Sequence, residues 1–126
     1  MAAPTRNVLV DKVLSQWGVP AAQFEIDHEA QLTLGGVPAT VVAGRHGDML
    51  HVYIDLGYHE GRDVHRRLLE LNAPIQAPAN GYFALDPVLK SVLYRVDVPL
   101  SPMVDAVQLG RALGTLASTV RRNLAI

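Results

Sequence analysis

SVLYRVDVPL, residues 91–100, is the stretch of sequence that decides the fold. Its apolar residues recur at every second position, and they are Val92, Tyr94, Val96 and Val98. Leu93, Arg95 and Asp97 lie between them. A period of two is typical of a β-strand with one buried face. Residues 49–56, MLHVYIDL, alternate in the same way, so we expect a sheet whose second face meets water or a ligand.

Three further strands surround this pattern. Residues 31–34 and 37–45 flank Gly35-Gly36, a pair that can adopt the positive φ angles of a tight hairpin turn. A second turn at His46-Gly47-Asp48 leads into residues 49–56 and predicts an antiparallel meander. Residues 81–86 form a short strand that a turn at Asp86-Pro87 connects to the strand beginning at residue 91.

Helical spacing of apolar residues marks three other segments. Residues 7–17 carry an apolar stripe that ends before Gly18, and residues 62–72 carry one that ends before Pro74. The last helix is predicted to begin with Ser101 as N-cap and Pro102 as its first residue. Its predicted buried side consists of Val104, Val107, Leu113, Leu116, Val120 and Leu124. The predicted fold class is α+β, an antiparallel sheet with helices in the order α-β-β-β-α-β-β-α.

Composition narrows the class of protein. The 126 residues suit one domain, 1–126, and 49% of them are hydrophobic. A net charge of −1 argues against nucleic acid and an anionic membrane surface as partners. No segment matches a signal peptide or the ~18 consecutive apolar residues of a membrane span. The absence of cysteine excludes disulfides and zinc–thiolate sites, and it suits the cytoplasm.

The residues that could carry chemistry form no catalytic pattern. His59 and His65 match no metal-ligand spacing, and His28-Glu29 lacks the second histidine of the helical zinc-protease motif. We therefore expect neither an enzyme nor a bound metal or cofactor. The alternative is an enzyme or small-ligand domain, which would require a polar constellation around His51, Tyr53 and Asp55.

Apolar residues exceed what the core of a monomer requires. Leu9 widens the stripe of the first helix, Leu69 lies beside the stripe of residues 62–72, and Leu93 interrupts a polar strand face. Together they favour an oligomer with an additional apolar groove. In the last helix, Gly110 and Gly114 would allow another backbone to approach closely.

Three local motifs indicate a family. Residues 68–76, LLELNAPIQ, form a leucine-rich helix that ends in Asn and an apolar turn. Residues 81–87, GYFALDP, form a Gly-led strand that ends in Leu-Asp and a turn, and residues 91–100 end in a Pro-Leu entry into the last helix. These motifs and the order of elements resemble the class I type III secretion chaperones, the Tir-chaperone (CesT-like) family. That family is usually acidic, whereas this chain is nearly neutral.

The resemblance implies a non-catalytic chaperone in the bacterial cytoplasm. It would bind the N-terminal region of a type III secreted effector as an extended segment and keep that effector soluble and secretion-competent. Effector contacts are expected at Leu9, Val13, Leu14, Trp17, Val41 and Tyr53. A homodimer is expected, with its interface at Leu68, Leu69, Leu71 and Leu93. The residues leave open another α+β interaction module, or a subunit without a chaperone role.

Overall fold

The structure, a computed structural model, describes residues 8–19, 29–43, 49–59, 62–73 and 81–124, without the side chains of Val8, Leu9, Asp11 and Arg62. Its elements are α1 (Val8–Gln16), β1 (Glu29–Leu34), β2 (Val37–Ala43), β3 (Met49–Tyr58), α3 (Arg62–Leu71), β4 (Tyr82–Asp86), β5 (Ser91–Pro99) and α4 (Ala106–Leu124). The predicted α+β class and order of elements are confirmed. The single domain and the homodimer stay predictions.

The five strands form one antiparallel sheet in the order β1-β2-β3-β5-β4. The β1–β2 hairpin turns at Gly35 and Gly36, whose φ angles of 54° and 80° lie in the left-handed region that favours glycine. Leu34 pairs with Val37 across this turn. The two longest strands, β3 and β5, pair at the centre, and β1 and β4 form the edges.

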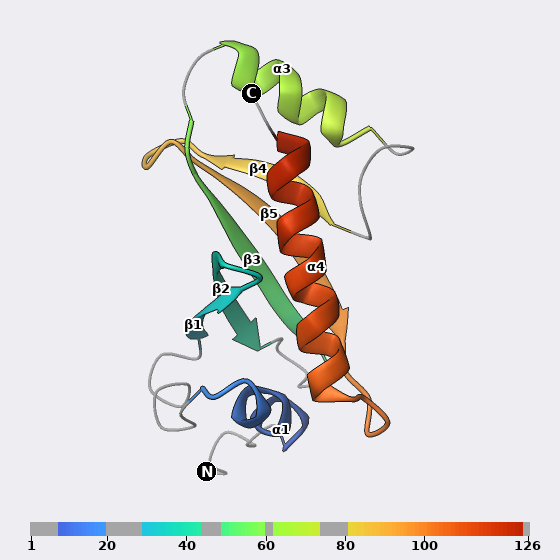
Figure 1. Ribbon diagram of the computed structural model, residues 1–126. Coiled ribbons are helices and arrows are strands. Elements are labelled where there is room, and N and C mark those ends of the chain that lie inside the picture. The colour runs from blue at the N-terminus through green and yellow to red at the C-terminus, as the bar shows by residue number, and fades with distance from the viewer. Residues whose placement is uncertain (1–7, 20–28, 44–48, 60–61, 74–80, 125–126) are drawn as a thin grey trace.

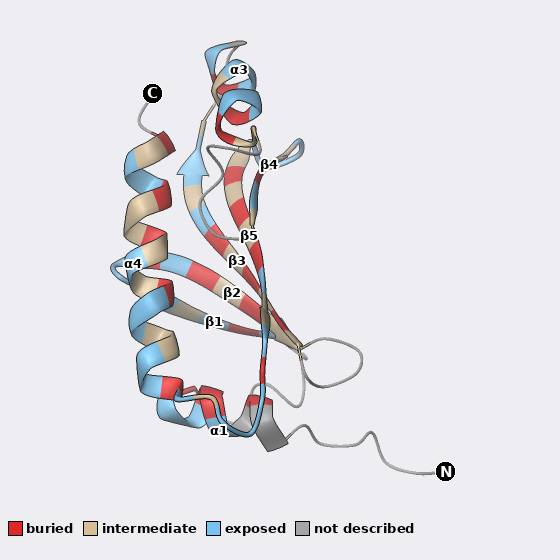
Figure 2. Cartoon of the chain, turned by 90° about the vertical axis from the view of Figure 1, so that its right-hand side faces the viewer, coloured by how far each residue is buried: buried red, intermediate tan, exposed pale blue. Residues whose placement is uncertain are grey.

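One long helix covers one face of the sheet, as Figures 1 and 2 show. This helix is α4, and it contacts β1 and β2 as well as the other two described helices. α1 lies near the beginning of α4 and α3 near its end (Figure 1). No described helix covers the opposite face of the sheet, which we call the open face.

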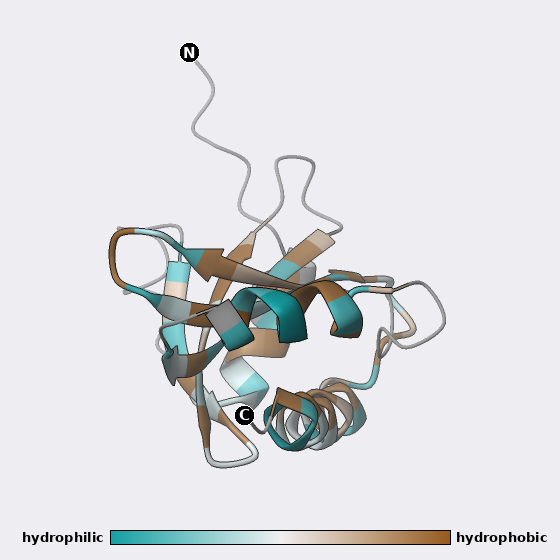
Figure 3. Ribbon diagram, turned by 90° about the horizontal axis from the view of Figure 1, so that it is seen from above, coloured by the Kyte–Doolittle hydropathy of each residue, from teal (hydrophilic) through white to brown (hydrophobic). Residues whose placement is uncertain are grey.

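The core lies between α4 and the sheet. Alternate residues of the two central strands point into it, namely Leu50, Val52 and Ile54 from β3 and Val92, Tyr94 and Val96 from β5. Each of these residues is at most 6% exposed, as their period of two predicts. Burial of one such side chain stabilises the fold by about 1.5–3 kcal/mol. Figure 3, which views α4 nearly end-on, shows polar and apolar residues on different sides of this helix.

The start of α4 differs from the prediction. The Val104 N–H donates to the Ser101 carbonyl at 3.0 Å, so residues 101–104 form a turn, in which Pro102 occupies a position that suits its fixed φ. The N-cap is Asp105, whose Oδ1 accepts from the backbone N–H of Val107 at 3.0 Å and of Gln108 at 3.1 Å. The predicted cap at Ser101 is therefore wrong, because the sequence offers two capping residues and the turn occupies the first.

The buried side of α4 shifts with this later start. Val107 is 50% exposed, whereas Ala106 and Ala117 are buried. Leu113, Val120 and Leu124 are buried as predicted, and Val104 and Leu116 are partly buried. Small residues thus occupy part of the contact between α4 and the sheet.

The β1–β2 hairpin meets α4 at Gly114. A Cβ added to Gly35 would collide with the carbonyl oxygen of Gly114, and one added to Gly114 would lie 3.3 Å from the Gly35 backbone nitrogen. The Ser118 hydroxyl donates to the Gly35 carbonyl at 3.4 Å. The predicted close approach of another backbone at Gly114 is confirmed, and it fixes the hairpin against the helix.

The motifs that carried the family resemblance have structural roles. The Asn72 Nδ2 donates to the Phe83 carbonyl at 2.9 Å, and the Phe83 N–H donates to Asn72 Oδ1 at 2.6 Å. The Asn72 amide thereby pairs with β4 as a further strand would. A Cβ added to Gly81 would collide with the Tyr94 ring, whose hydroxyl is bonded to the Gly81 backbone. Burial raises the pKa of that hydroxyl, and the bond to Gly81 offsets part of the increase.

Candidate binding surfaces

A groove of ≈870 Å³ runs between α4 and the edge strand β1, and we call it the α4–β1 groove. One wall comes from α4, the other from β1 and its turn, and the end of α1 closes it. The lining residues are Gln16, Trp17, Leu32, Thr33, Leu34, Gly35, Val107, Gly110, Arg111, Gly114, Thr115, Ser118 and Arg122. Its volume falls within the ~300–1,000 Å³ that is typical of ligand-binding clefts.

Trp17 is the largest side chain that lines this groove. Its indole Nε1 donates to the Ala106 carbonyl at 2.8 Å, and a Cβ added to Gly110 would lie 2.7 Å from the same nitrogen. The missing side chain at Gly110 therefore leaves room for the ring. Because the indole N–H is already satisfied, the ring can offer a ligand only its apolar surface. The bond also fixes the ring before binding, which lowers the entropic cost of association.

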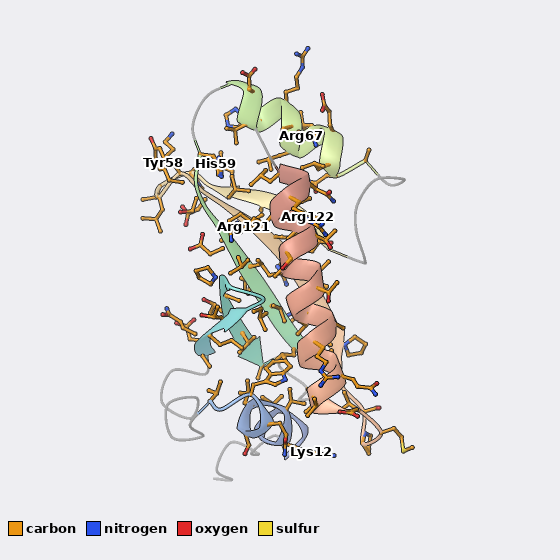
Figure 4. All side chains as sticks on the ribbon, in the orientation of Figure 1. Lys12, Tyr58, His59, Arg67, Arg121 and Arg122 are labelled. Atoms are coloured by element: carbon orange, nitrogen blue, oxygen red, sulfur yellow. The ribbon has the colours of Figure 1, made fainter. Side chains whose placement is uncertain are left out.

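Two arginines line the same groove. Arg111 and Arg122 are exposed and lie about three turns apart on α4, a separation of ~16 Å along its axis. Figure 4 shows Arg122 in the part of α4 that is closer to α3. No Asp or Glu is among the lining residues. The groove thus combines an apolar floor with positive charge.

The open face carries a polar cluster of His51, Tyr53, Tyr82, Arg95 and Asp97. His51 Nδ1 lies 2.6 Å from Asp97 Oδ1, and the Arg95 guanidinium lies 5.4 Å from the centre of the Tyr53 ring. Arg95 Nη1 also donates to the Tyr82 hydroxyl at 3.2 Å. The hydrogen bond from His51, followed by the charge of Arg95, holds the pKa of the Asp97 carboxyl below its usual value. These contacts join neighbouring strands, so the cluster braces the sheet.

The enzyme alternative depended on His51, Tyr53 and Asp55. The first two belong to the polar cluster of the open face. Asp55 Oδ1 accepts from the Gly57 N–H at 2.9 Å, within β3, where the pairing with β5 shifts register. His51 and Tyr53 therefore have contacts that connect β3 to β5, whereas the contact of Asp55 is local to β3.

The predicted dimer residues divide between core and surface. Leu68 and Leu71 are 7% and 4% exposed because α3 packs on α4 and β4. Leu69 is 76% exposed, and Leu93 lies partly buried on the open face. The Arg67 Nη2 donates to the Asn123 carbonyl at 2.8 Å, which ties α3 to the end of α4. Leu69 is thus available to a second copy, and the interface itself stays a prediction.

The predicted effector-binding residues do not share one surface. Val13 and Val41 are 0% exposed and Leu14 is 2% exposed, so these three form part of the core. Trp17 lines the α4–β1 groove, whereas Tyr53 lies under Arg95 on the open face. The side chain of Leu9 is outside the described residues. Of the predicted effector-binding residues whose side chains the structure describes, only Trp17 lines the α4–β1 groove. Val13, Leu14 and Val41 cannot contact a partner, because their side chains have almost no exposed surface.

Most of the groove was not predicted from the sequence. Gly110 and Gly114 indicate close approach, and the arginines of the last helix indicate a polar side. Neither pattern shows that Trp17 meets this helix, since its bonding partner Ala106 is 89 residues away along the chain. The available signal was a tryptophan at a helix end together with two glycines four residues apart in another helix.

These features define a class of protein, an α+β domain with a partly apolar groove along the edge strand of its antiparallel sheet. The described residues contain no helix long and apolar enough to span a membrane. They also contain no group of three or more His, Cys, Asp or Glu side chains placed to hold a metal ion.

Comparison with known families identifies the particular family. The model of the Tir chaperone protein (CesT) family matches residues 9–122. The chain therefore belongs to the Tir chaperone protein (CesT) family, and the resemblance found in its motifs is confirmed. No curated protein sequence matches the chain significantly.

Three solved structures share the fold. The ExsC–ExsE complex gives a TM-score of 0.66 at 18% identity and covers 94% of this chain and 92% of that chain. The heterodimeric ExoU–SpcU complex from the type III secretion system of Pseudomonas aeruginosa gives a TM-score of 0.60 at 20% identity. This match covers 92% of this chain and 98% of that chain. The HopA1–SchA chaperone–effector complex gives a TM-score of 0.57 at 12% identity, and the match covers 90% of this chain and 91% of that chain. At these identities the likeness concerns the fold alone.

Proposed function

We propose that this chain is a non-catalytic chaperone of the bacterial cytoplasm that binds the N-terminal region of a type III secreted effector. Bound to the chaperone, the effector stays soluble and competent for secretion. Membership of the Tir chaperone protein family supports the chaperone role. The shared fold of a chaperone–effector complex and of a complex from a type III secretion system supports the choice of client.

The α4–β1 groove is the observation that carries this proposal. An unfolded client loses conformational entropy on binding, so it requires anchor sites that exist before it arrives. The fixed ring of Trp17 and the neighbouring apolar lining of β1 at Leu32 form such a site. The backbone of the edge strand β1 lies along the same groove and can pair with an extended segment.

The homodimer belongs to the same proposal. Leu69 projects from α3 with 76% of its surface exposed, so it can pack against a second copy without any change in the protomer. Two copies present two grooves to one client chain. Binding at the first groove then raises the effective concentration of the client at the second.

Deletion of the gene in its own bacterium tests the function. We expect one effector to disappear from the secreted fraction and from the soluble cytoplasmic fraction, while other effectors are secreted normally. The purified chaperone should form a complex with the N-terminal segment of that effector, with two chaperone chains for each segment by light scattering. Unchanged secretion and solubility of every effector would contradict the proposal.

A further inference from the structure

The charge of the α4–β1 groove goes beyond what an apolar anchor requires. α4 contains Arg111, Arg121 and Arg122 and no Asp or Glu. Two of these arginines line the groove, although the net charge of the chain is −1. Asp105, the acidic residue just before the helix, is occupied as its N-cap and does not line the groove.

The two groove arginines also have no compensating partner in the described part of the chain. There, Arg67 and Arg95 form ion pairs with Glu70 and Asp97, whereas neither Arg111 nor Arg122 is paired. An exposed arginine is hydrated and stable without a partner. Beside an apolar groove, however, it remains available for a carboxylate that arrives with a ligand.

We propose that the α4–β1 groove selects client segments that are both apolar and acidic, an inference that rests on the proposed function. An apolar side chain of the client packs on the ring of Trp17, and two client carboxylates pair with Arg111 and Arg122. The arginines are ~16 Å apart along the helix axis. An extended chain advances about 3.3 Å per residue, so acidic residues four to six positions apart can reach both guanidinium groups.

The charge also argues against other occupants. Residues 1–7 of this chain, MAAPTRN, contain Arg6 and no acidic residue, so they would add positive charge to the groove. A second copy that docked through the same face would bring its own arginines toward these. A client segment with carboxylates satisfies both the apolar floor and the charge.

The single tryptophan of the chain makes a direct test possible, because Trp17 lines this groove. We would titrate the purified chain with two synthetic 12-residue peptides that lack tryptophan. Both carry the same central leucine and isoleucine residues, flanked by two glutamates five positions apart in one and by two lysines in the other. The glutamate peptide should change the Trp17 emission and bind about tenfold more tightly at low salt, with the preference falling as salt is added.

Charge reversal supplies the decisive variants. Arg111→Glu with Arg122→Glu should invert the preference, so that the lysine peptide becomes the tighter ligand. Arg121→Glu is the matched control, since Arg121 is equally exposed but lines a different hollow with Asp55 and Gly57, and it should keep the glutamate preference. Circular dichroism would verify that all variants are folded.

Equal binding of the two peptides, or an unchanged preference in the doubly reversed variant, would overturn the proposal. The same variants separate it from the proposed function. A doubly reversed chaperone that still binds and delivers its effector with unchanged affinity leaves the chaperone role intact and removes charge selection by this groove.

Discussion

Asn72 shows how one side chain can hold two elements together. Its two hydrogen bonds with the backbone of Phe83 join the end of α3 to the outer edge of β4. Asn72→Ala would leave a partly buried N–H and carbonyl without partners, so we expect the free energy of unfolding to fall by about 1–3 kcal/mol. Denaturant unfolding measures the change. Gln108→Ala, which removes an exposed amide from α4, should have little effect, and an equal loss in both variants would contradict the role of Asn72.

Asp97 makes stability depend on pH. Its pKa lies below the ordinary value of 3.8 in the folded chain, chiefly because of the hydrogen bond from His51. A lowered folded pKa means that the unfolded chain binds the proton more readily. The resulting stabilisation is complete well above pH 3.8 and is lost as the pH falls through the folded pKa. Because the carboxyl is exposed, solvent screening keeps the effect small.

The substitution that tests this dependence is Asp97→Asn. The difference in free energy of unfolding between the wild type and this variant should be present at neutral pH and shrink steadily in acid. Glu29→Gln removes an exposed carboxylate that has no ion-pair partner among the described residues, and it serves as control. A difference for Asp97→Asn that grows toward low pH would reverse the sign and contradict the assignment.

At the scale of elements, the contact between the β1–β2 hairpin and α4 depends on one missing side chain. Gly35 and Gly36 both have positive φ, so alanine at either position costs about 1–2 kcal/mol of backbone strain. Only at Gly35 does the new Cβ collide with Gly114. Gly35→Ala should therefore be destabilised by a further ~1–3 kcal/mol relative to Gly36→Ala. Thermal unfolding of the two variants compares them, and equal losses would show that the hairpin can move away from the helix at no cost.

The elements themselves were predictable because their signals are local. A period of two identifies β3 and β5, and Gly35-Gly36 identifies the hairpin between β1 and β2. The start of α4 was not predictable, since Ser101 and Asp105 are both good N-cap residues. Which of the two caps the helix depends on the turn that precedes it. Local patterns specify which segments are helices and strands, and competition between neighbouring signals decides where each one begins.

The binding surface belongs to the scale of the whole molecule, and there the sequence was a weaker guide. Val13 and Val41 lie in apolar stripes whose sequence pattern is the same for a core residue and for a groove residue. In the structure both are buried in the core. Trp17 packs against Gly110 of α4 and remains partly accessible. Periodicity identifies apolar faces, whereas the separation of core from groove depends on which faces meet, and that requires the tertiary structure.

Assembly is the largest scale, and Leu69 tests it. This side chain is 76% exposed in the protomer, so Leu69→Glu should leave the fold intact and yield a soluble monomer, because a charge buried in a dimer interface is costly. Leu68→Glu, at a position only 7% exposed, should instead unfold the protomer. Met103→Glu introduces the same charge at a residue that is 90% exposed in the segment before α4, and it should preserve the dimer because α3 lies near the other end of α4 in Figure 1. Light scattering combined with circular dichroism distinguishes the three outcomes, and a folded dimer of Leu69→Glu would remove this side of α3 from the interface.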